Sequence, residues 1–194
     1  SKGATTIAAY DVGSTGRARS YGLVDLEGDE VVDFQEKPED PKSTLVSIAT
    51  YAFPAETLPL LSAYLDGDNN PDEPGWFIQW LQERHPVYAF SFDGAWFDIG
   101  TPESYLEAVR WALDGRNVVA EDATLEGSTL GSNVHVMAGA EIEDSHVDNS
   151  VVFPAATIRS CDVRDSIIDE QTHLENIDFS GALVGAHTSI TNGE

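Results

Sequence analysis

The sequence predicts an α/β domain over residues 1–113, followed by a left-handed parallel β-helix over residues 117–194. Up to residue 113, short β-prone runs alternate with helix-forming runs, which is typical of part of an α/β domain. From Val136 onward, aliphatic residues recur with a period of sixteen, which indicates a stacked repeat. The polar stretch from Asp114 to Asn117 is the expected boundary.

The elements of the first part are expected in the following order. They are a strand within residues 1–12, a loop over Asp11–Gly16, paired strands at Tyr21–Asp25 and Val31–Gln35, a strand at Leu45–Phe53, a helix at Pro54–Leu65, a polar loop over Asp66–Gly75, a helix at Trp76–Glu83 and a strand at Val87–Phe92. The sequence Glu27-Gly28-Asp29 supplies the turn between the paired strands. In the helix at Pro54–Leu65, the residues expected to face the core are Leu58, Leu61, Ala63 and Leu65.

The second part shows one pattern in each repeat. Val136, Val152, Ile168 and Val184 head successive repeats, and the further inward positions are Ile142, Val147, Ile158, Val163, Leu174, Phe179 and Ile190. A small residue follows four positions after each head, at Ala140, Ala156, Thr172 and Thr188. This spacing resembles the hexapeptide repeats of left-handed β-helices, whose tight corners need small side chains. Antiparallel strands would instead require strict alternation and Asn-Gly hairpins, which the sequence lacks. Because such coils must stack, a scaffold and a homo-oligomer contact are the expected roles.

An aspartate stands out just before the last helix of the first part. Ala95, Trp96, Phe97 and Ile99 around Asp98 are typical of a strand end, and Gly100 breaks the run. Thr101 can cap a helix that starts at Pro102 and ends near Asp114-Gly115. Its expected buried stripe is Tyr105, Leu106, Val109, Ala112 and Leu113. A carboxylate fixed at such a junction is a suitable ligand for Mg²⁺, and the plainer alternative is a helix-capping acid.

This segment resembles the W-x-D-I-G-T-P-x-x-Y motif of the sugar-1-phosphate nucleotidyltransferases. The resemblance extends to Tyr21-Gly22 and Glu36-Lys37-Pro38, which are similar to that family's Y-G and E-K-P segments. It implies that Asp98 is one of two aspartates holding a catalytic Mg²⁺, that Glu36 and Lys37 contact the sugar phosphate, and that Tyr21-Gly22 lines the sugar pocket. It also implies that residues 1–113 are the C-terminal half of a Rossmann-like nucleotidyltransferase domain.

The chemistry of Lys37 agrees with that assignment. The chain has three lysines, Lys2, Lys37 and Lys42, and a compact ammonium group is a natural partner for phosphate. Nucleotidyl transfer depends mainly on positioning and charge neutralisation around phosphorus, so Lys37 is a candidate catalytic residue. The alternative for Lys37 is a solvated turn lysine paired with Glu36 or Glu39.

Two features depart from the family pattern. The G-x-G-T-R-x-x-P loop that cradles the nucleotide triphosphate, and the first metal aspartate, are not in this sequence. We therefore expect the chain to be the C-terminal portion of a longer enzyme and to be inactive alone. In the stretch Ser47-Ile48-Ala49-Thr50-Tyr51, alanine replaces the glycine that the family usually has two places before the tyrosine.

Composition limits the setting of the protein. With 34 acidic and 10 basic residues, the net charge is -24, which excludes non-specific nucleic-acid binding and association with anionic membranes. The hydrophobic fraction of 41% and the four tryptophans indicate a folded protein. The acid excess suggests a halophile, and Cys161 as the single cysteine excludes an intramolecular disulfide. No signal peptide and no long apolar run is visible in these residues, so the cytoplasm is the expected compartment.

The sequence therefore predicts part of an enzyme that joins a sugar 1-phosphate, expected to be glucose 1-phosphate, to a nucleoside triphosphate with release of pyrophosphate. A first alternative is a regulatory or scaffold subunit that kept the fold without the activity. A second is a hexapeptide-repeat acyltransferase, in which one of His135, His146, His173 and His187 would be catalytic. No long insertion interrupts the coils, so these histidines are expected to be polar residues on the outer face.

Overall fold

A computed structural model describes residues 3–193 and divides the chain into two compact units, Ser1–Trp96 and Phe97–Glu194. The ends of two expected elements, Ser1 and Lys2 in the first strand and Glu194 in the last repeat, lie outside the described residues. The helix that precedes the repeats packs within the second unit, so this division falls before the helix. Within residues 3–193, no helix is both long and apolar enough to cross a membrane.

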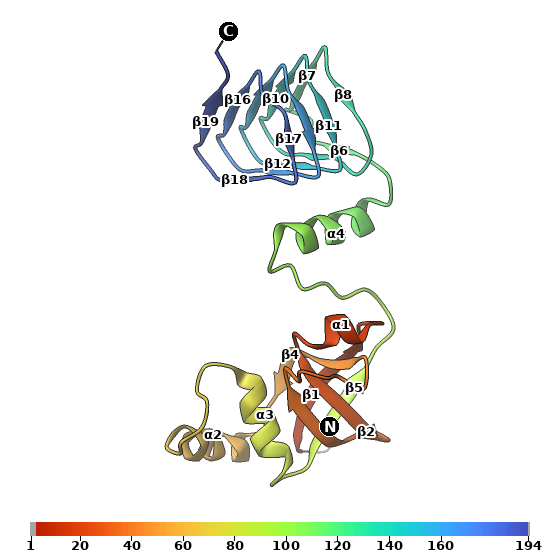
Figure 1. Cartoon of the computed structure of the whole chain (residues 1–194), viewed down its shortest axis with the longest axis vertical. Helices are drawn as coiled ribbons and strands as arrows, with labels where there is room; N and C mark the ends of the chain where they lie inside the picture. The colour runs from red at the N-terminus through yellow and green to blue at the C-terminus, as the bar shows by residue number, and fades with distance from the viewer. Residues whose placement is uncertain (1–2, 194) are drawn as a thin grey trace. The chain divides into compact units, whose positions relative to one another are not determined.

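The first unit is built on five strands that close on themselves in the order β1-β4-β2-β3-β5 (Figure 1). The strands are β1 (Thr5–Asp11), β2 (Gly22–Glu27), β3 (Glu30–Glu36), β4 (Leu45–Ala52) and β5 (Val87–Ser91). The expected hairpin is confirmed, because β2 and β3 pair antiparallel on either side of Gly28, whose φ is 68°. Most of the pairing is antiparallel, and only β1 and β5 run parallel.

Four helical segments accompany this sheet. They are α1 (Thr15–Ala18), the 3₁₀ turn η1 (Ala55–Thr57), α2 (Leu58–Leu65) and α3 (Pro74–Gln82). Helix α3 supplies Phe77, Ile78 and Leu81 to a core that includes Ile7 and Phe34. A smaller cluster around Ala18 packs α1 against β2 and β4. The core thus fixes α3 against the sheet, and this contact positions the site described below.

The expected core face of α2 is wrong. Leu58 and Leu65 have 59% and 51% of their surface exposed, and Leu61 and Ala63 are also exposed. The buried residue of this helix is Tyr64. Because α2 is apolar on most of its circumference, the sequence pattern could not indicate which side of the helix faces the sheet.

The segment between β5 and the next helix differs from the expected strand end. No residue between Phe92 and Gly100 pairs with another strand, so the expectation for Ala95–Ile99 is wrong. Bulky apolar residues in this stretch pack through their side chains instead, as in the contact between Phe97 and Trp111, whose ring centroids are 5.7 Å apart.

The helix that follows, α4 (Pro102–Leu113), begins and ends as expected. Thr101 and Ser104 form a reciprocal capping box, and Asp114 ends the helix in the left-handed conformation. Leu106 is buried against the β-helix, whereas Ala112 of the expected stripe is exposed. The last turn of α4 therefore extends beyond the apolar surface that the helix covers.

The remainder of the unit is a parallel β-helix made of three sheets (Figure 1). Its strands are β6 (Val118–Val119), β7 (Thr124–Glu126), β8 (Thr129–Leu130), β9 (His135–Val136), β10 (Glu141–Glu143), β11 (His146–Asp148), β12 (Val151–Val152), β13 (Thr157–Arg159), β14 (Asp162–Arg164), β15 (Ile167–Ile168), β16 (His173–Glu175), β17 (Phe179–Ser180), β18 (Leu183–Val184) and β19 (Ser189–Thr191). All the expected inward positions pack in one cluster, which confirms the sixteen-residue register. Ile158, for example, lies between Ile142 and Leu174 in adjacent coils.

The corners of the coils show a repeated backbone conformation. Asp144, Ser160 and Asn176 stack at one corner with φ of 46°, 51° and 55°. Asn, Asp and Gly tolerate this left-handed conformation better than other residues. The corner chemistry is thus part of the repeat, together with the buried Ala140 and Ala156 that the sequence indicated.

Candidate functional site

The two motifs of the first unit, Tyr21-Gly22 and Glu36-Lys37, lie together at one end of the hairpin. Gly22 pairs directly with Glu36 across β2 and β3. The backbone N–H of Lys37 donates a hydrogen bond of 3.1 Å to the carbonyl oxygen of Tyr21. The ring of Tyr21 meets Trp96 edge-on, with centroids 5.4 Å apart. Residues fourteen to sixteen positions apart in the sequence therefore meet at the start of β2 and the end of β3.

Two glycines enclose the carboxylate of Glu36. A Cβ placed on Gly75 would lie 1.7 Å from Oε2 of Glu36, and one placed on Gly22 would lie 2.8 Å from the same oxygen. Gly75 is in the first turn of α3, and Gln79 of the same helix accepts a hydrogen bond of 2.9 Å from the backbone N–H of Glu36. At Gly75 the half-buried carboxylate occupies the space that a side chain would need, and at Gly22 the Phe34 ring, 2.3 Å from the Cβ position, occupies it together with the carboxylate.

Burial raises the pKa of the Glu36 carboxyl above its usual value, and the charge of Glu73 raises it further. Lys37 acts in the opposite direction, but its effect is smaller. A carboxylate held in this way is poorly solvated. It therefore gains from any ligand that offers hydrogen-bond donors, such as the hydroxyl groups of a sugar.

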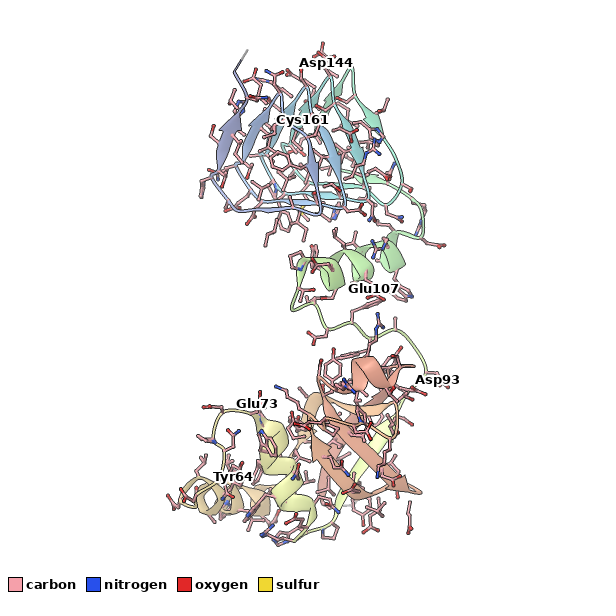
Figure 2. The ribbon with its side chains drawn as sticks, in the orientation of Figure 1. Tyr64, Glu73, Asp93, Glu107, Asp144 and Cys161 are labelled. Atoms are coloured by element: carbon pink, nitrogen blue, oxygen red, sulfur yellow. The ribbon has the colours of Figure 1, made fainter. Side chains whose placement is uncertain are left out.

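Lys37 is held differently, at the surface. Its φ is 45°, a conformation that is unfavourable for a residue with a side chain and that is often found at functional sites. Its Nζ donates a hydrogen bond to Oε1 of Glu73, which immediately precedes α3 (Figure 2). This bond raises the pKa of Lys37 and lowers that of Glu73. Both side chains are more than one third exposed, so the ion pair is weak and an anionic ligand can displace Glu73.

Three small residues lie side by side with Glu36 across the sheet, namely Gly22 on β2, Ser47 on β4 and Ala9 on β1. Gly22 pairs with Ser47 on β4, and Ser47 pairs with Ala9 on β1. Directly opposed residues of antiparallel strands share a face, so the Ser47 side chain is on the same face as Glu36. Its buried hydroxyl lies close enough to the Tyr51 phenol to perturb it, but forms no regular hydrogen bond among the described residues. The Ser47 hydroxyl is therefore a polar group of this face, next to the Tyr51 phenol.

Ala49 lies on β4, the strand that also carries Ser47. Its φ is 55°, which explains physically why glycine suits this position. Alanine keeps the left-handed backbone at a cost of about 1 kcal/mol. The departure from the family pattern therefore adds backbone strain to β4 at this position.

Asp98 lies in the second unit, in the irregular segment before α4. It is exposed, and its Oδ1 accepts a hydrogen bond of 3.2 Å from the backbone N–H of Gly100. Thr101 and Ser104 form the capping box of α4, and the Asp98 bond goes to Gly100, the residue just before the N-cap. Within residues 3–193, no three His, Cys, Asp or Glu side chains cluster as a metal site. One accessible carboxylate suits a magnesium site that takes its other ligands from substrate phosphates and water.

The histidines of the β-helix do not converge. His135 is on β9, His146 on β11 and His173 on β16, and these strands belong to three different sheets. His146 contacts Thr129 through Nδ1 at 2.9 Å, and His173 lies 3.6 Å from Glu175. As expected, they are polar residues of the outer faces.

Sequence reasoning missed Glu73, Gly75 and Gln79, which surround Glu36 and Lys37. They are brought there by the packing of α3 on β3, a contact between segments more than thirty positions apart. The only local signal was a glycine directly after Pro74, at the start of a helix where alanine would be preferred.

Comparison with known proteins gives consistent matches. Residues 1–115 match the family described as nucleotidyl transferase, and residues 112–188 match the GlmU-like C-terminal hexapeptide family. The glucose-1-phosphate adenylyltransferase of Bacillus cytotoxicus is 28% identical over 91% of this chain and 52% of its own length. The enzyme of the same name from Geobacillus stearothermophilus is 32% identical over 74% of this chain and 39% of its own length. The chain thus spans about half the length, or less, of these relatives. The coils are a left-handed parallel β-helix of hexapeptide type, and the chain belongs to the nucleotidyl transferase family.

Proposed function

We propose that the chain is the sugar-phosphate-binding part of an enzyme that transfers a nucleotidyl group to glucose 1-phosphate. The observation that carries the proposal is the convergence of Glu36, Lys37 and the Tyr21-Gly22 pair at one end of the β2–β3 hairpin. An oxygen of the sugar phosphate attacks the α-phosphorus of the triphosphate, the bond to the leaving oxygen breaks, and pyrophosphate departs. The names of the relatives support an adenylyl group and glucose.

Each residue has a role that follows from its chemistry. Lys37 exchanges Glu73 for the phosphate of the sugar, and its ammonium group neutralises part of the negative charge around phosphorus. Glu36 accepts hydrogen bonds from sugar hydroxyl groups, and the Ser47 hydroxyl offers one more polar contact on the same face. Asp98 is the proposed ligand of Mg²⁺, an ion that would supply charge neutralisation at the phosphates.

Binding of glucose 1-phosphate to this chain tests the assignment of Lys37. Replacing Lys37 with alanine should weaken binding about tenfold or more, because a charge-assisted bond to phosphate contributes roughly 1.5–3 kcal/mol. Lys42→Ala is the matched control, since Lys42 is also exposed and lies outside the site. Titration calorimetry measures both. Equal affinities for the two variants would contradict the proposal.

The proposed role of Asp98 is tested by measuring catalytic turnover. In an enzyme that contains this chain, Asp98→Asn should lower kcat by several orders of magnitude and leave glucose 1-phosphate binding nearly unchanged. Its stability should also be unchanged, because the side chain is exposed. A variant that turns over normally would remove Asp98 from the metal site. Intact sugar-phosphate binding without any turnover in the unaltered enzyme would instead favour the regulatory or scaffold subunit.

We also propose that the protein works at high salt, in the cytoplasm, and that it associates through its β-helix, where Val118, Leu125 and Leu183 are exposed apolar residues. With a net charge of -24, lowering the salt concentration should lower the melting temperature, since unscreened carboxylates repel one another. Differential scanning calorimetry between molar and millimolar salt measures the effect. A constant melting temperature would argue against adaptation to salt.

A further inference from the structure

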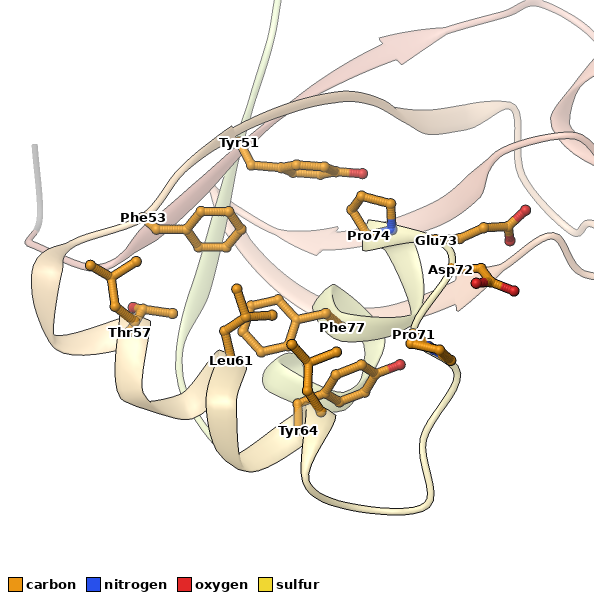
Figure 3. Close-up of a pocket in the computed structure, with 12 residues that line it drawn as sticks. Tyr51, Phe53, Thr57, Leu61, Tyr64, Pro71, Asp72, Glu73, Pro74 and Phe77 are labelled. Atoms are coloured by element: carbon orange, nitrogen blue, oxygen red, sulfur yellow. The ribbon is translucent and has the colours of Figure 1, made fainter.

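A cavity of about 420 Å³ lies between β4, α2 and the loop before α3 (Figure 3). Its walls are mostly apolar, and the aromatic residues among them are Tyr51, Phe53, Tyr64 and Phe77. It is distinct from the Glu36 site, with which it shares only the edge formed by Tyr51 and Glu73. Its volume is within the range of cavities that bind small molecules.

The aromatic rings form a connected and well-fixed wall. Phe53 lies between Tyr51 and Phe77, with ring centroids at 6.0 Å and 5.8 Å. Tyr64 meets Phe77 edge-on at 5.4 Å, and its hydroxyl donates a hydrogen bond to the carbonyl oxygen of Asn70. Because these contacts hold the rings, the cavity needs little rearrangement to receive a ligand.

The charged residues that line the cavity are both acidic, and one of them, Glu73, is paired with Lys37 outside the lining. Asp72 and Glu73 lie together at one end, and no Lys, Arg or His lines the cavity among the described residues (Figure 3). The net charge of -24 further favours cations over anions near this surface. Aromatic faces attract cations through their quadrupoles, most strongly when the cation is weakly hydrated, as a quaternary ammonium is.

We propose that this cavity is a binding site for a small organic cation with an apolar body, of the alkyl- or arylammonium class. The apolar body packs against Leu61 and the aromatic rings, and the ammonium group lies toward Asp72 and Glu73. Since Glu73 also binds Lys37, a cation in the cavity competes with Lys37 for this carboxylate. The binding itself does not depend on the proposed enzymatic function.

The test uses three probes with one aromatic ring each: benzyltrimethylammonium, benzyl alcohol and phenylacetate. Titration calorimetry of this chain, in salt that screens its overall charge, should show saturable binding of the cation at one site. The neutral probe should bind about tenfold more weakly or worse, and the anion should not bind measurably. No binding of the cation, or equal binding of the alcohol, would overturn the proposal.

Substitutions inside and outside the cavity test whether the cation binds there. Phe53→Leu keeps the bulk but removes an aromatic face, and should weaken cation binding roughly five- to thirtyfold. Phe90→Leu is the control, because Phe90 is an exposed aromatic residue outside the cavity. Leu61→Trp, at a position already 38% exposed, should fill the cavity and abolish binding without unfolding the chain. Binding that survives Leu61→Trp, with an unchanged circular dichroism spectrum, would place the cation elsewhere.

Two substitutions of acidic residues test the contribution of charge to cation binding. Asp72→Asn should weaken the cation several-fold, whereas Asp68→Asn, outside the cavity, should not. Equal losses of cation affinity in the two variants would mean that the cation is attracted to the acidic surface as a whole. That result would overturn the proposed binding site. A helical peptide that binds this face while benzyltrimethylammonium does not would also overturn it, in favour of a protein partner.

Discussion

Replacing Ile158 with aspartate should unfold the β-helix, because the new carboxylate would be buried without a partner. Ile158 has no exposed surface and is stacked between Ile142 and Leu174. An unpaired buried charge costs several kcal/mol, which is a large part of the ~5–15 kcal/mol that stabilises a typical domain. Far-UV circular dichroism and thermal melting of the variant measure the loss.

The matched control is Thr157→Asp, on the same strand but on its outward side, where solvent can hydrate the charge. It should cost at most about 1 kcal/mol through repulsion by neighbouring acids. Ile158→Val should cost only ~0.5–1.5 kcal/mol, since it removes one methylene group. A native spectrum and melting curve for Ile158→Asp would contradict the register in which this residue faces the interior.

Gly75→Ala should remove most of the affinity for glucose 1-phosphate while the fold stays as stable or becomes more so. The added Cβ would lie 1.7 Å from Oε2 of Glu36, so the carboxylate must leave its place. A displaced Glu36 can no longer accept the bonds that we assign to the sugar, and we expect a loss of at least about tenfold. Alanine is favoured over glycine in a helix by about 1 kcal/mol, and a carboxylate that moves toward solvent loses its desolvation penalty.

Gly16→Ala is the matched control. Gly16 also occupies the second position of a helix, and the nearest atom to an added Cβ is Oγ of Ser14 at 3.4 Å. This variant should gain the same helix propensity without any change in binding. Calorimetric titration and thermal melting of both proteins give the comparison. Full affinity in Gly75→Ala would show that Glu36 does not contact the sugar, and a large loss of stability would show that the site is mainly structural.

Local signals predicted much of this fold. The cap at Thr101, the turn at Gly28 and the period of the β-helix each depend on residues close in sequence or on strict repetition, and each was confirmed. The side of α2 that faces the sheet was not predictable, because only tertiary packing selects Tyr64 over the neighbouring leucines. Ala95–Ile99 had the composition of a strand but has no neighbouring strand to pair with.

The candidate site likewise combines residues that local motifs indicated with residues that only tertiary packing brings together. Short motifs indicated Tyr21-Gly22 and Glu36-Lys37, and the hairpin register explains why they meet. Glu73 and Gly75 have no motif that sequence reasoning recognised. Their importance follows from the close approach of α3 to Glu36, which depends on how Phe77 and Ile78 pack against the sheet. The assignment of Asp98 to Mg²⁺ stays a prediction.

The stacking of the coils limits how the length of this chain can change during evolution. Ile142, Ile158, Leu174 and Ile190 are in register at intervals of one coil, so inserting or deleting a whole coil keeps the remaining coils in register. Losing a single residue would move the following side chains from the interior to the solvent. Related proteins can therefore lengthen or shorten this part by whole coils of about sixteen residues.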